Sequence, residues 1–350
     1  MSLLSPNDEL MLLREMLEIY SPSGEEEELS NYLYARFRAL GFHTYQDGVG
    51  NVIGITGHGD KEIILLGHMD TVGGFLPVRQ EEERLYGRGA VDAKGSLAAF
   101  IAAAARVAAT ANKRIVVIGA VEEETSSRGA RALLSNFTPD YVVIGEPSGW
   151  EHITLGYKGR LLVRYRLSSR VKHSSAEGPS ASERAVEFWN RLIAYADELN
   201  QGQRWHFHTL DPFLRRLTST AGDLAEEVIM DITLRTPFDL DIPALKERMR
   251  SWAGEAAVGF SGEDSPFRAS KNTPLVRAFL KAIRSQGGNP LFKLKLGSSD
   301  MNTVGPLWKC PIIAYGPGDS TLDHTPEERL ELDAYYRAIE ILSHVLTNLT

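Results

Sequence analysis

Three short apolar segments of this chain each lead into side chains that can bind a metal ion or transfer a proton. The segments are 62–66, 114–120 and 141–145, and each is rich in Val, Ile or Leu. Runs of this length and composition are typical of strands buried on both faces of a sheet. Parallel strands end at a common edge, which is where open α/β sheets hold their ligands. The sequence therefore predicts an α/β fold with its chemistry at the carboxyl ends of these strands.

Histidine and carboxylate side chains follow each segment. His68 and Asp70 come soon after the first, Glu123 and Glu124 after the second, and Glu146 after the third. One such motif alone is more often a polar turn at the surface. Its recurrence after three predicted buried strands favours a functional site.

Two further residues complete a set that could hold metal ions. Asp92 precedes a predicted helix, and His324 lies in the loop after the last predicted strand. Two imidazoles and three carboxylates suit two hard or borderline divalent ions, zinc above all, with one carboxylate bridging them. The candidate ligands are His68, Asp92, Glu124, Glu146 and His324.

Two carboxylates beside these ligands have other expected roles. Asp70 is placed to accept a hydrogen bond from the second ring nitrogen of His68, which would fix the tautomer of that ligand. Glu123 is adjacent to Glu124, so one can bind metal while the other faces the substrate as general base. For Glu123 alone, a solvated acidic run is the alternative interpretation.

Composition limits the class of protein. The 350 residues are enough for two domains, and a formal net charge of −8 argues against general nucleic-acid binding. The single cysteine, Cys310, excludes an internal disulfide and a cysteine-based metal cluster. Residues 1–9 do not resemble a signal peptide, and the longest apolar tract, 97–105, is shorter than the ~20 residues that span a membrane. We expect a soluble, cytoplasmic protein.

Periodicity and turn signals predict most of the remaining elements. Asn7 is expected to cap the first helix, and a hairpin is expected between His43 and Ile55. Helices are predicted over about 7–19, 25–40, 96–109, 273–286 and 327–346, and further strands over 292–296 and 311–315.

The pattern changes between residues 158 and 270. There the expected order of elements is βαββαβ, a small α+β unit of ferredoxin-like type. We therefore predict a catalytic domain formed by 1–157 and 271–350, with a domain inserted at 158–270. The first strand of the insert places basic residues on one face, which suits either a solvated edge strand or a docking surface. These residues are Lys158, Arg160, Arg164, Arg166, Arg170 and Lys172.

Several motifs, in order along almost the whole chain, resemble one enzyme family. They are Gly67-His68-Met69-Asp70-Thr71-Val72, Gly87-Arg88-Gly89, Asp92-Ala93-Lys94-Gly95, Glu122-Glu123-Glu124, Gly145-Glu146-Pro147-Ser148 and Asp323-His324-Thr325-Pro326. The family is the co-catalytic zinc family that contains acetylornithine deacetylase, succinyl-diaminopimelate desuccinylase, aminoacylase and glutamate carboxypeptidase. One departure is Glu122, where many members have Asp.

The resemblance implies roles for the candidate residues. It implies one zinc on His68, Asp92 and Glu146, and a second on Asp92, Glu124 and His324, with cobalt able to substitute. It also implies a catalytic domain with a central mixed β-sheet flanked by helices. Glu123 would be the acid and base, and the inserted domain would serve as a dimerisation or lid domain in a homodimer.

The resemblance also extends to the substrate site. His173 resembles the histidine that stabilises the oxyanion, in its own or the partner subunit's site. Arg235 resembles the arginine that binds the substrate α-carboxylate through a bidentate fork. The stretch Ser298, Ser299 and Asp300 resembles a substrate loop of the family.

The sequences of residues 89–95, 296–306 and 315–320 are most similar to those of one branch of the family. Members of this branch release lysine or ornithine during lysine or arginine biosynthesis. Their substrates are an acidic amino-group carrier protein, cleaved at its terminal glutamyl isopeptide, or the N-acetyl amino acid. We predict a metal-dependent hydrolase of linear amides with such a substrate. A di- or tripeptidase or carboxypeptidase on the same scaffold is the alternative, and a non-catalytic binding protein is a remote one.

Overall fold

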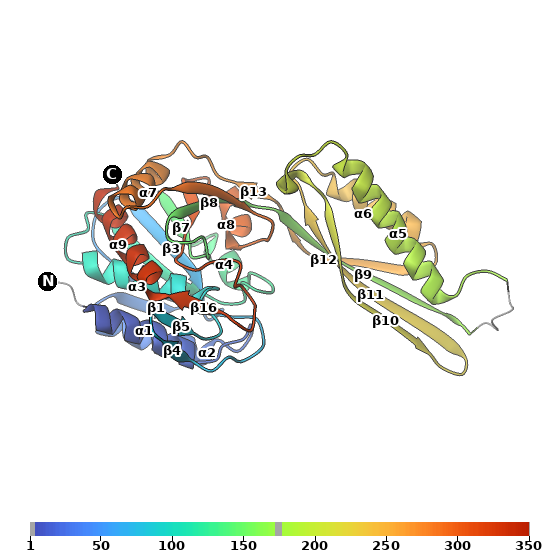
Figure 1. Cartoon of the computed structure of the whole chain (residues 1–350), viewed down its shortest axis with the longest axis horizontal. Coiled ribbons are helices and arrows are strands. Elements are labelled where there is room, and N and C mark those ends of the chain that lie inside the picture. Colours follow the sequence, from blue (N-terminus) through green and yellow to red (C-terminus); the bar gives the residue numbers. More distant parts are fainter. Residues whose placement is uncertain (1–3, 172–176, 350) are drawn as a thin grey trace. The chain divides into compact units, whose positions relative to one another are not determined.

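The computed structural model describes residues 4–171 and 177–349 and divides the chain into two compact units (Figure 1). Unit 1 comprises residues 1–156, 268–294 and 299–350. Unit 2 comprises residues 157–267 and 295–298. Across the described ranges, no helix is both long enough and apolar enough to span a membrane.

A mixed sheet forms the centre of unit 1. Its strand order is β1-β2-β6-β3-β7-β15-β8-β13, and β14 pairs with β8. The neighbours β6, β3, β7 and β15 run parallel, whereas β2 is antiparallel to β6 and β8 is antiparallel to β15. The strands are β1 (His43–Gln46), β2 (Val52–Thr56), β3 (Glu62–His68), β6 (Arg114–Ala120), β7 (Tyr141–Ile144), β8 (His152–Tyr157), β13 (Phe267–Arg268), β14 (Leu291–Lys295) and β15 (Ile312–Ala314). The predicted α/β class with a central mixed sheet is confirmed.

Helices cover this sheet. They are α1 (Pro6–Glu18), α2 (Glu27–Ala39), α3 (Lys94–Val107), α4 (Arg128–Leu133), α7 (Pro274–Ser285), α8 (Asp300–Trp308) and α9 (Leu332–Asn348). Helix α3 contacts β3 and β6 as well as α1 and α9, and all its residues except Arg106 are buried. Its small alanine side chains suit a helix that is packed on several sides.

Two predicted helix starts are wrong. Ser5, not Asn7, caps α1, because Ser5 and Asp8 form a reciprocal capping box. The last helix begins at Leu332, because the residues before it form β16 (Arg329–Glu331). Strand β16 pairs with β5 (Arg84–Tyr86), which also pairs with β4 (Arg79–Glu81). The amphipathic pattern runs through this junction, so sequence periodicity does not reveal it.

Unit 2 contains a four-stranded antiparallel sheet of order β10-β11-β9-β12. Its elements follow the chain order β9 (Gly159–Arg170), α5 (Ala181–Asn200), η1 (His206–His208), β10 (Asp211–Ala221), β11 (Ala225–Thr236), α6 (Ile242–Ala253) and β12 (Ala257–Asp264). Helices α5 and α6 lie along one side of the sheet (Figure 1); α5 contacts β9, β10 and β11, and α6 contacts β12. Apolar side chains of both helices form one core with alternate residues of β9 and β11. Its expected role as a dimerisation or lid domain stays a prediction.

The basic face expected on β9 differs from the prediction. Lys158 is fully buried, and its ammonium group donates to the carbonyl of His206 at 2.9 Å and to Asp211 Oδ2 at 2.5 Å. Carbonyl oxygens from a segment much later in the chain surround this lysine, which its local sequence could not indicate. Lys172 lies outside the described residues.

The exposed arginines of β9 are largely neutralised by β11. Arg164 Nε lies 2.7 Å from Asp231 Oδ1, and Arg166 Nε lies 2.5 Å from Glu227 Oε1. The outer face of this sheet therefore carries both signs of charge, not a continuous positive stripe.

Candidate metal centre

The parallel strands of unit 1 bring the candidate ligands to one edge of the sheet. His68 ends β3 and is level with Ala120, the last residue of β6. Glu123 and Glu124 follow β6, and Glu146 follows β7. The buried strands therefore deliver their polar ends to a common place, as the sequence indicated.

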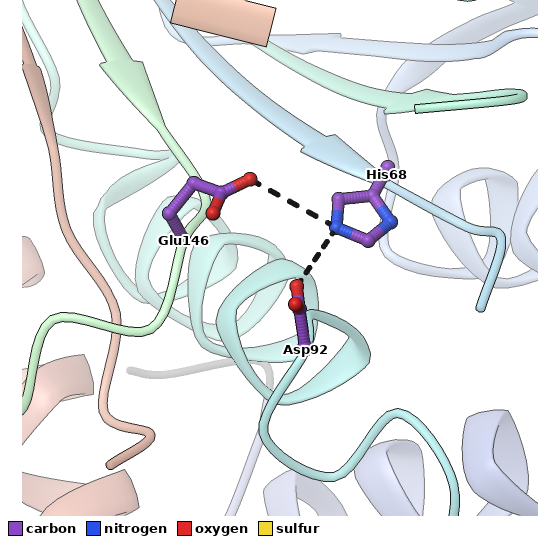
Figure 2. A group of neighbouring side chains, drawn as sticks. All are labelled: His68, Asp92 and Glu146. Carbon is purple, nitrogen blue, oxygen red and sulfur yellow. Dashed lines mark hydrogen bonds and ion pairs between the residues drawn. The ribbon is translucent and has the colours of Figure 1, made fainter. Parts of the chain in front are cut away.

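One group of possible ligands consists of His68, Asp92 and Glu146 (Figure 2). Nε2 of His68 lies 3.2 Å from Oδ1 of Asp92 and 4.0 Å from Oε1 of Glu146. The side chain of His68 is 2% exposed and that of Asp92 is 12% exposed, so this group lies inside the protein. In Figure 2 both carboxylates face the same ring nitrogen.

A second group consists of Asp92, Glu124 and His324. Nε2 of His324 lies 3.2 Å from Oδ2 of Asp92 and 2.9 Å from Oε1 of Glu124. The two oxygens of Asp92 thus face different histidines, as a carboxylate shared by two ions must. The His324 side chain is 46% exposed, so the second group is more open to solvent than the first.

The electrostatics of this cluster suit cations. Desolvation and the charge of Asp92 raise the pKa of Glu124. Hydrogen bonds with Asp92 and Glu124 raise the pKa of His324 to about 10. Both shifts favour the protonated forms, and the negative charges of Asp92 and Glu124 contribute to them. Oxygen and imidazole donors around such charge fit two divalent ions of the hard or borderline kind.

Asp70 contacts His68, as expected, and also the backbone of Glu123 and Glu124. The carbonyl oxygen of Asp70 lies 2.9 Å from Nδ1 of His68, and its carboxylate oxygen Oδ1 lies 3.4 Å away. The same carboxylate accepts hydrogen bonds from the backbone N–H groups of Glu123 and Glu124, each at 3.0 Å, and from the hydroxyl of Ser23 at 2.7 Å. Burial opposes ionisation, but His68 and Ser23 outweigh it and lower the pKa of Asp70. Asp70 therefore orients both a ligand histidine and the turn that bears the two glutamates.

Glu123 is close to the ligands without belonging to either group. Desolvation and the negative charge of Glu146 raise the pKa of Glu123 well above its ordinary value, and the charge of Asp300 adds to this shift. Asp300 is the first residue of α8 in unit 1 and is 2% exposed. It lies near the cluster, because its charge acts on Glu123. The catalytic role of Glu123 stays a prediction.

The remaining predicted site residues are divided between the units. Ser299 caps α8 by accepting a hydrogen bond from the N–H of Met301 at 3.2 Å, within unit 1. Arg235, near the end of β11, donates to the hydroxyl of Ser298 at 3.2 Å, within unit 2. His173 lies outside the described residues.

Sequence reasoning missed one residue of this centre. Glu328 was expected within the last helix, but it precedes β16 and is 1% exposed. Its carboxylate binds Arg88 and the backbone at Asp92. An acidic residue shortly after His324 was the only signal in the sequence, and it does not distinguish a buried carboxylate from a solvated one.

Comparison with known proteins finds relatives along almost the whole chain. A family model described as "Peptidase family M20/M25/M40" matches residues 64–348. A [LysW]-lysine hydrolase of Deinococcus radiodurans is 44% identical over 347 residues, covering 97% of this chain and 96% of that protein. A [LysW]-lysine/[LysW]-ornithine hydrolase of Saccharolobus islandicus is 29% identical over 337 residues, covering 94% of this chain and 92% of that protein.

Solved structures show the same fold. An M20 family metallo-carboxypeptidase from Sulfolobus solfataricus has a TM-score of 0.79 and 20% identity, covering 97% of this chain and 98% of that chain. A tripeptidase from Staphylococcus aureus has a TM-score of 0.80 and 19% identity, covering 99% of this chain and 98% of that chain. At these identities the likeness concerns the fold alone.

Proposed function

Because this chain belongs to peptidase family M20/M25/M40 and is a metal-dependent amide hydrolase, we propose that it releases lysine or ornithine from an amino-group carrier protein. The bond cleaved would be the isopeptide between the carrier's terminal glutamate and the amino acid. The observation that carries this substrate is the 44% identity, over nearly the full length, with a protein named [LysW]-lysine hydrolase. We infer that LysW is such a carrier, and that the reaction serves lysine or arginine biosynthesis in the cytoplasm.

We assign the ions to the two ligand groups described above, with Asp92 shared between them. Zinc is our proposed ion, and cobalt a competent substitute. When bound, these ions would polarise the scissile carbonyl and lower the pKa of a water molecule. The buried His68 would hold one ion and the exposed His324 the other.

The protein's own groups would move the proton and orient the substrate. Glu123 would accept the proton of the attacking water at its carboxylate and return it to the leaving amine. Asp70 would hold His68 and the glutamate turn in place, which its hydrogen bonds to both support. Arg235 would bind the α-carboxylate of the released amino acid, with Ser298, Ser299 and Asp300 beside the substrate, and His173 would stabilise the oxyanion.

A substrate panel tests this function. Purified protein with added zinc or cobalt is assayed on carrier bearing lysine or ornithine, on N-acetyl-lysine and N-acetyl-ornithine, and on several dipeptides. We expect kcat/KM to be highest for a carrier-linked substrate. Faster hydrolysis of dipeptides would instead support a di- or tripeptidase or carboxypeptidase, the alternative on the same scaffold.

Carrier docking would use the outer face of β9. The ion pairs on that face allow two double substitutions with opposite expected effects. An acidic carrier has to compete with Asp231 and Glu227 for the arginines. The double substitution Arg164→Glu and Arg166→Glu should raise KM for the carrier-linked substrate and spare N-acetyl-lysine. The matched double substitution Asp231→Asn and Glu227→Gln releases the arginines and should lower the same KM. Equal effects on both substrates would remove this docking surface from the proposal.

We also propose that the protein is a homodimer formed through unit 2. Light scattering of the full chain at several concentrations measures its mass. A monomer at assay concentrations would contradict this part of the proposal and leave the metal centre unaffected.

A further inference from the structure

A buried ion pair lies behind the shared carboxylate of the metal centre. Nη1 of Arg88 lies 2.7 Å from Oε2 of Glu328, and the two side chains are 8% and 1% exposed. The other carboxylate oxygen, Oε1, accepts hydrogen bonds from the backbone N–H groups of Gly89 and Val91 at 3.0 Å and of Asp92 at 3.1 Å. Glu328 therefore binds the backbone of the loop that presents Asp92.

Arg88 connects this loop to two others. Its Nε donates to the carbonyl of Gly74 at 3.0 Å, and its Nη1 donates to the carbonyl of Thr325 at 3.3 Å. Gly74 lies in the loop that continues from β3 beyond His68, and Thr325 is adjacent to His324. One guanidinium thus joins the loop that follows His68 to the residue after His324, two segments that are far apart in the sequence.

His324 lies in an irregular segment of the chain. Its side chain is 46% exposed, and its backbone has φ of +60°, in the left-handed region that non-glycine residues rarely adopt. The segment 316–328 contains turns but no helix or strand. Contacts of Thr325 and Glu328 with Arg88 connect this segment to the loop that carries Asp92.

We propose that Arg88 and Glu328 are positioning residues that hold Asp92 and His324 at their mutual spacing and so set the ion affinity of the Asp92–Glu124–His324 group. This inference rests on the proposed metal centre. It assigns a role to two residues that are not themselves candidate ligands. Groups that orient ligands in this way typically contribute about 10- to 100-fold to metal affinity.

The alternative is that the pair only stabilises the fold, and unit 1 offers a matched control. Arg106 of α3 and Glu9 of α1 form a second ion pair, with Nε 2.5 Å from Oε1; the Glu9 side chain is fully buried and that of Arg106 is 18% exposed. Neither Arg106 nor Glu9 belongs to a candidate ligand group. A loss of stability common to both pairs can therefore be separated from an effect on the ions.

The experiment titrates metal-stripped protein with zinc against a chromophoric chelator and compares Glu328→Gln with Glu9→Gln. We expect Glu328→Gln to weaken zinc binding at the Asp92–Glu124–His324 group by about 10- to 100-fold and binding of the other ion less. Glu9→Gln should lower Tm without changing either affinity. The cobalt form should show an altered absorption spectrum in Glu328→Gln only.

A second variant, Arg88→Lys, keeps the positive charge but lacks the fork that reaches Gly74 and Thr325. This variant should also weaken ion binding at the Asp92–Glu124–His324 group. It therefore tests the inference if Glu328→Gln does not fold. Unchanged affinities in both Glu328→Gln and Arg88→Lys would overturn the inference while leaving the proposed function intact. A wild-type protein that binds no divalent ion would overturn the metal centre and this inference together.

Discussion

Replacing Glu123 by Gln should separate catalysis from metal binding at the proposed metal centre. Gln has nearly the size of Glu, but its amide cannot accept and return a proton. Glu123 belongs to neither ligand group, so the substitution removes no candidate ligand atom. Loss of a positioned general base typically lowers turnover by about 10²- to 10⁴-fold. This corresponds to about 3 to 5 kcal/mol of transition-state free energy.

The pKa shift of Glu123 adds a prediction about stability. Its carboxyl has a raised pKa because desolvation and Glu146 disfavour the charged form. A carboxyl whose pKa is higher in the folded state opposes folding once the pH is high enough to ionise it in the unfolded chain. Gln carries no such charge, so the Tm of the metal-free variant should not fall below that of the wild type.

The assay measures kcat, KM and the zinc content of the same preparation. We expect kcat to fall by the factor above, with two ions still bound and KM changed much less. Glu122→Gln is the matched control, because Glu122 is ion-paired with Arg128 at 2.7 Å and belongs to neither ligand group. Glu123→Gln protein that keeps more than about a tenth of the wild-type kcat with both ions bound would refute the reasoning.

Three further predictions concern the ions and their ligands. Asp92→Ala should weaken both ions, because each of its oxygens lies 3.2 Å from a different histidine, whereas His68→Ala should weaken mainly one; elemental analysis after dialysis distinguishes the two results. A chelator should remove the ion beside His324 first, since that side chain is 46% exposed and His68 is 2% exposed, and release in a single kinetic phase would contradict this. In metal-free protein the raised pKa of His324, about 10 against an ordinary 6.5, gives stability that is complete below 6.5 and lost as the pH rises through about 10. Its Tm should fall across that window, and His324→Gln should flatten the fall.

The strands that position the centre were predictable from local sequence. Strands β3, β6 and β7 are uninterrupted apolar runs, and such runs are stable only where a sheet is covered on both faces. Parallel pairing then determines that their polar ends meet at one edge, as the register of His68 with Ala120 shows. The spacing of the ligands followed from this topology, although their assignment to two groups followed from the family resemblance.

Features that depend on distant contacts were not predictable. Strand β16 has three residues and forms only because β5, far earlier in the chain, offers an edge to pair with. Lys158 continues the alternation of β9 but is buried by carbonyl groups of the segment around His206. Neither the pairing of β16 nor the burial of Lys158 is visible in the local sequence. The residues around each would be the same if β16 were unpaired or Lys158 were exposed.

Local sequence also does not distinguish the acidic residues that could bind metal from those that hold the loops of the centre in place. Asp70 accepts hydrogen bonds from the backbone N–H groups of Glu123 and Glu124, and Glu328 accepts them from the backbone of the Asp92 loop. Each is a buried carboxylate that belongs to neither candidate ligand group but binds the backbone of a loop that carries a candidate ligand. A buried charge is tolerated when several donors satisfy it, and such a network fixes the conformation of its donors. The precision of the ligand positions therefore depends on acids that resemble the ligands in sequence and differ from them only in what they bind.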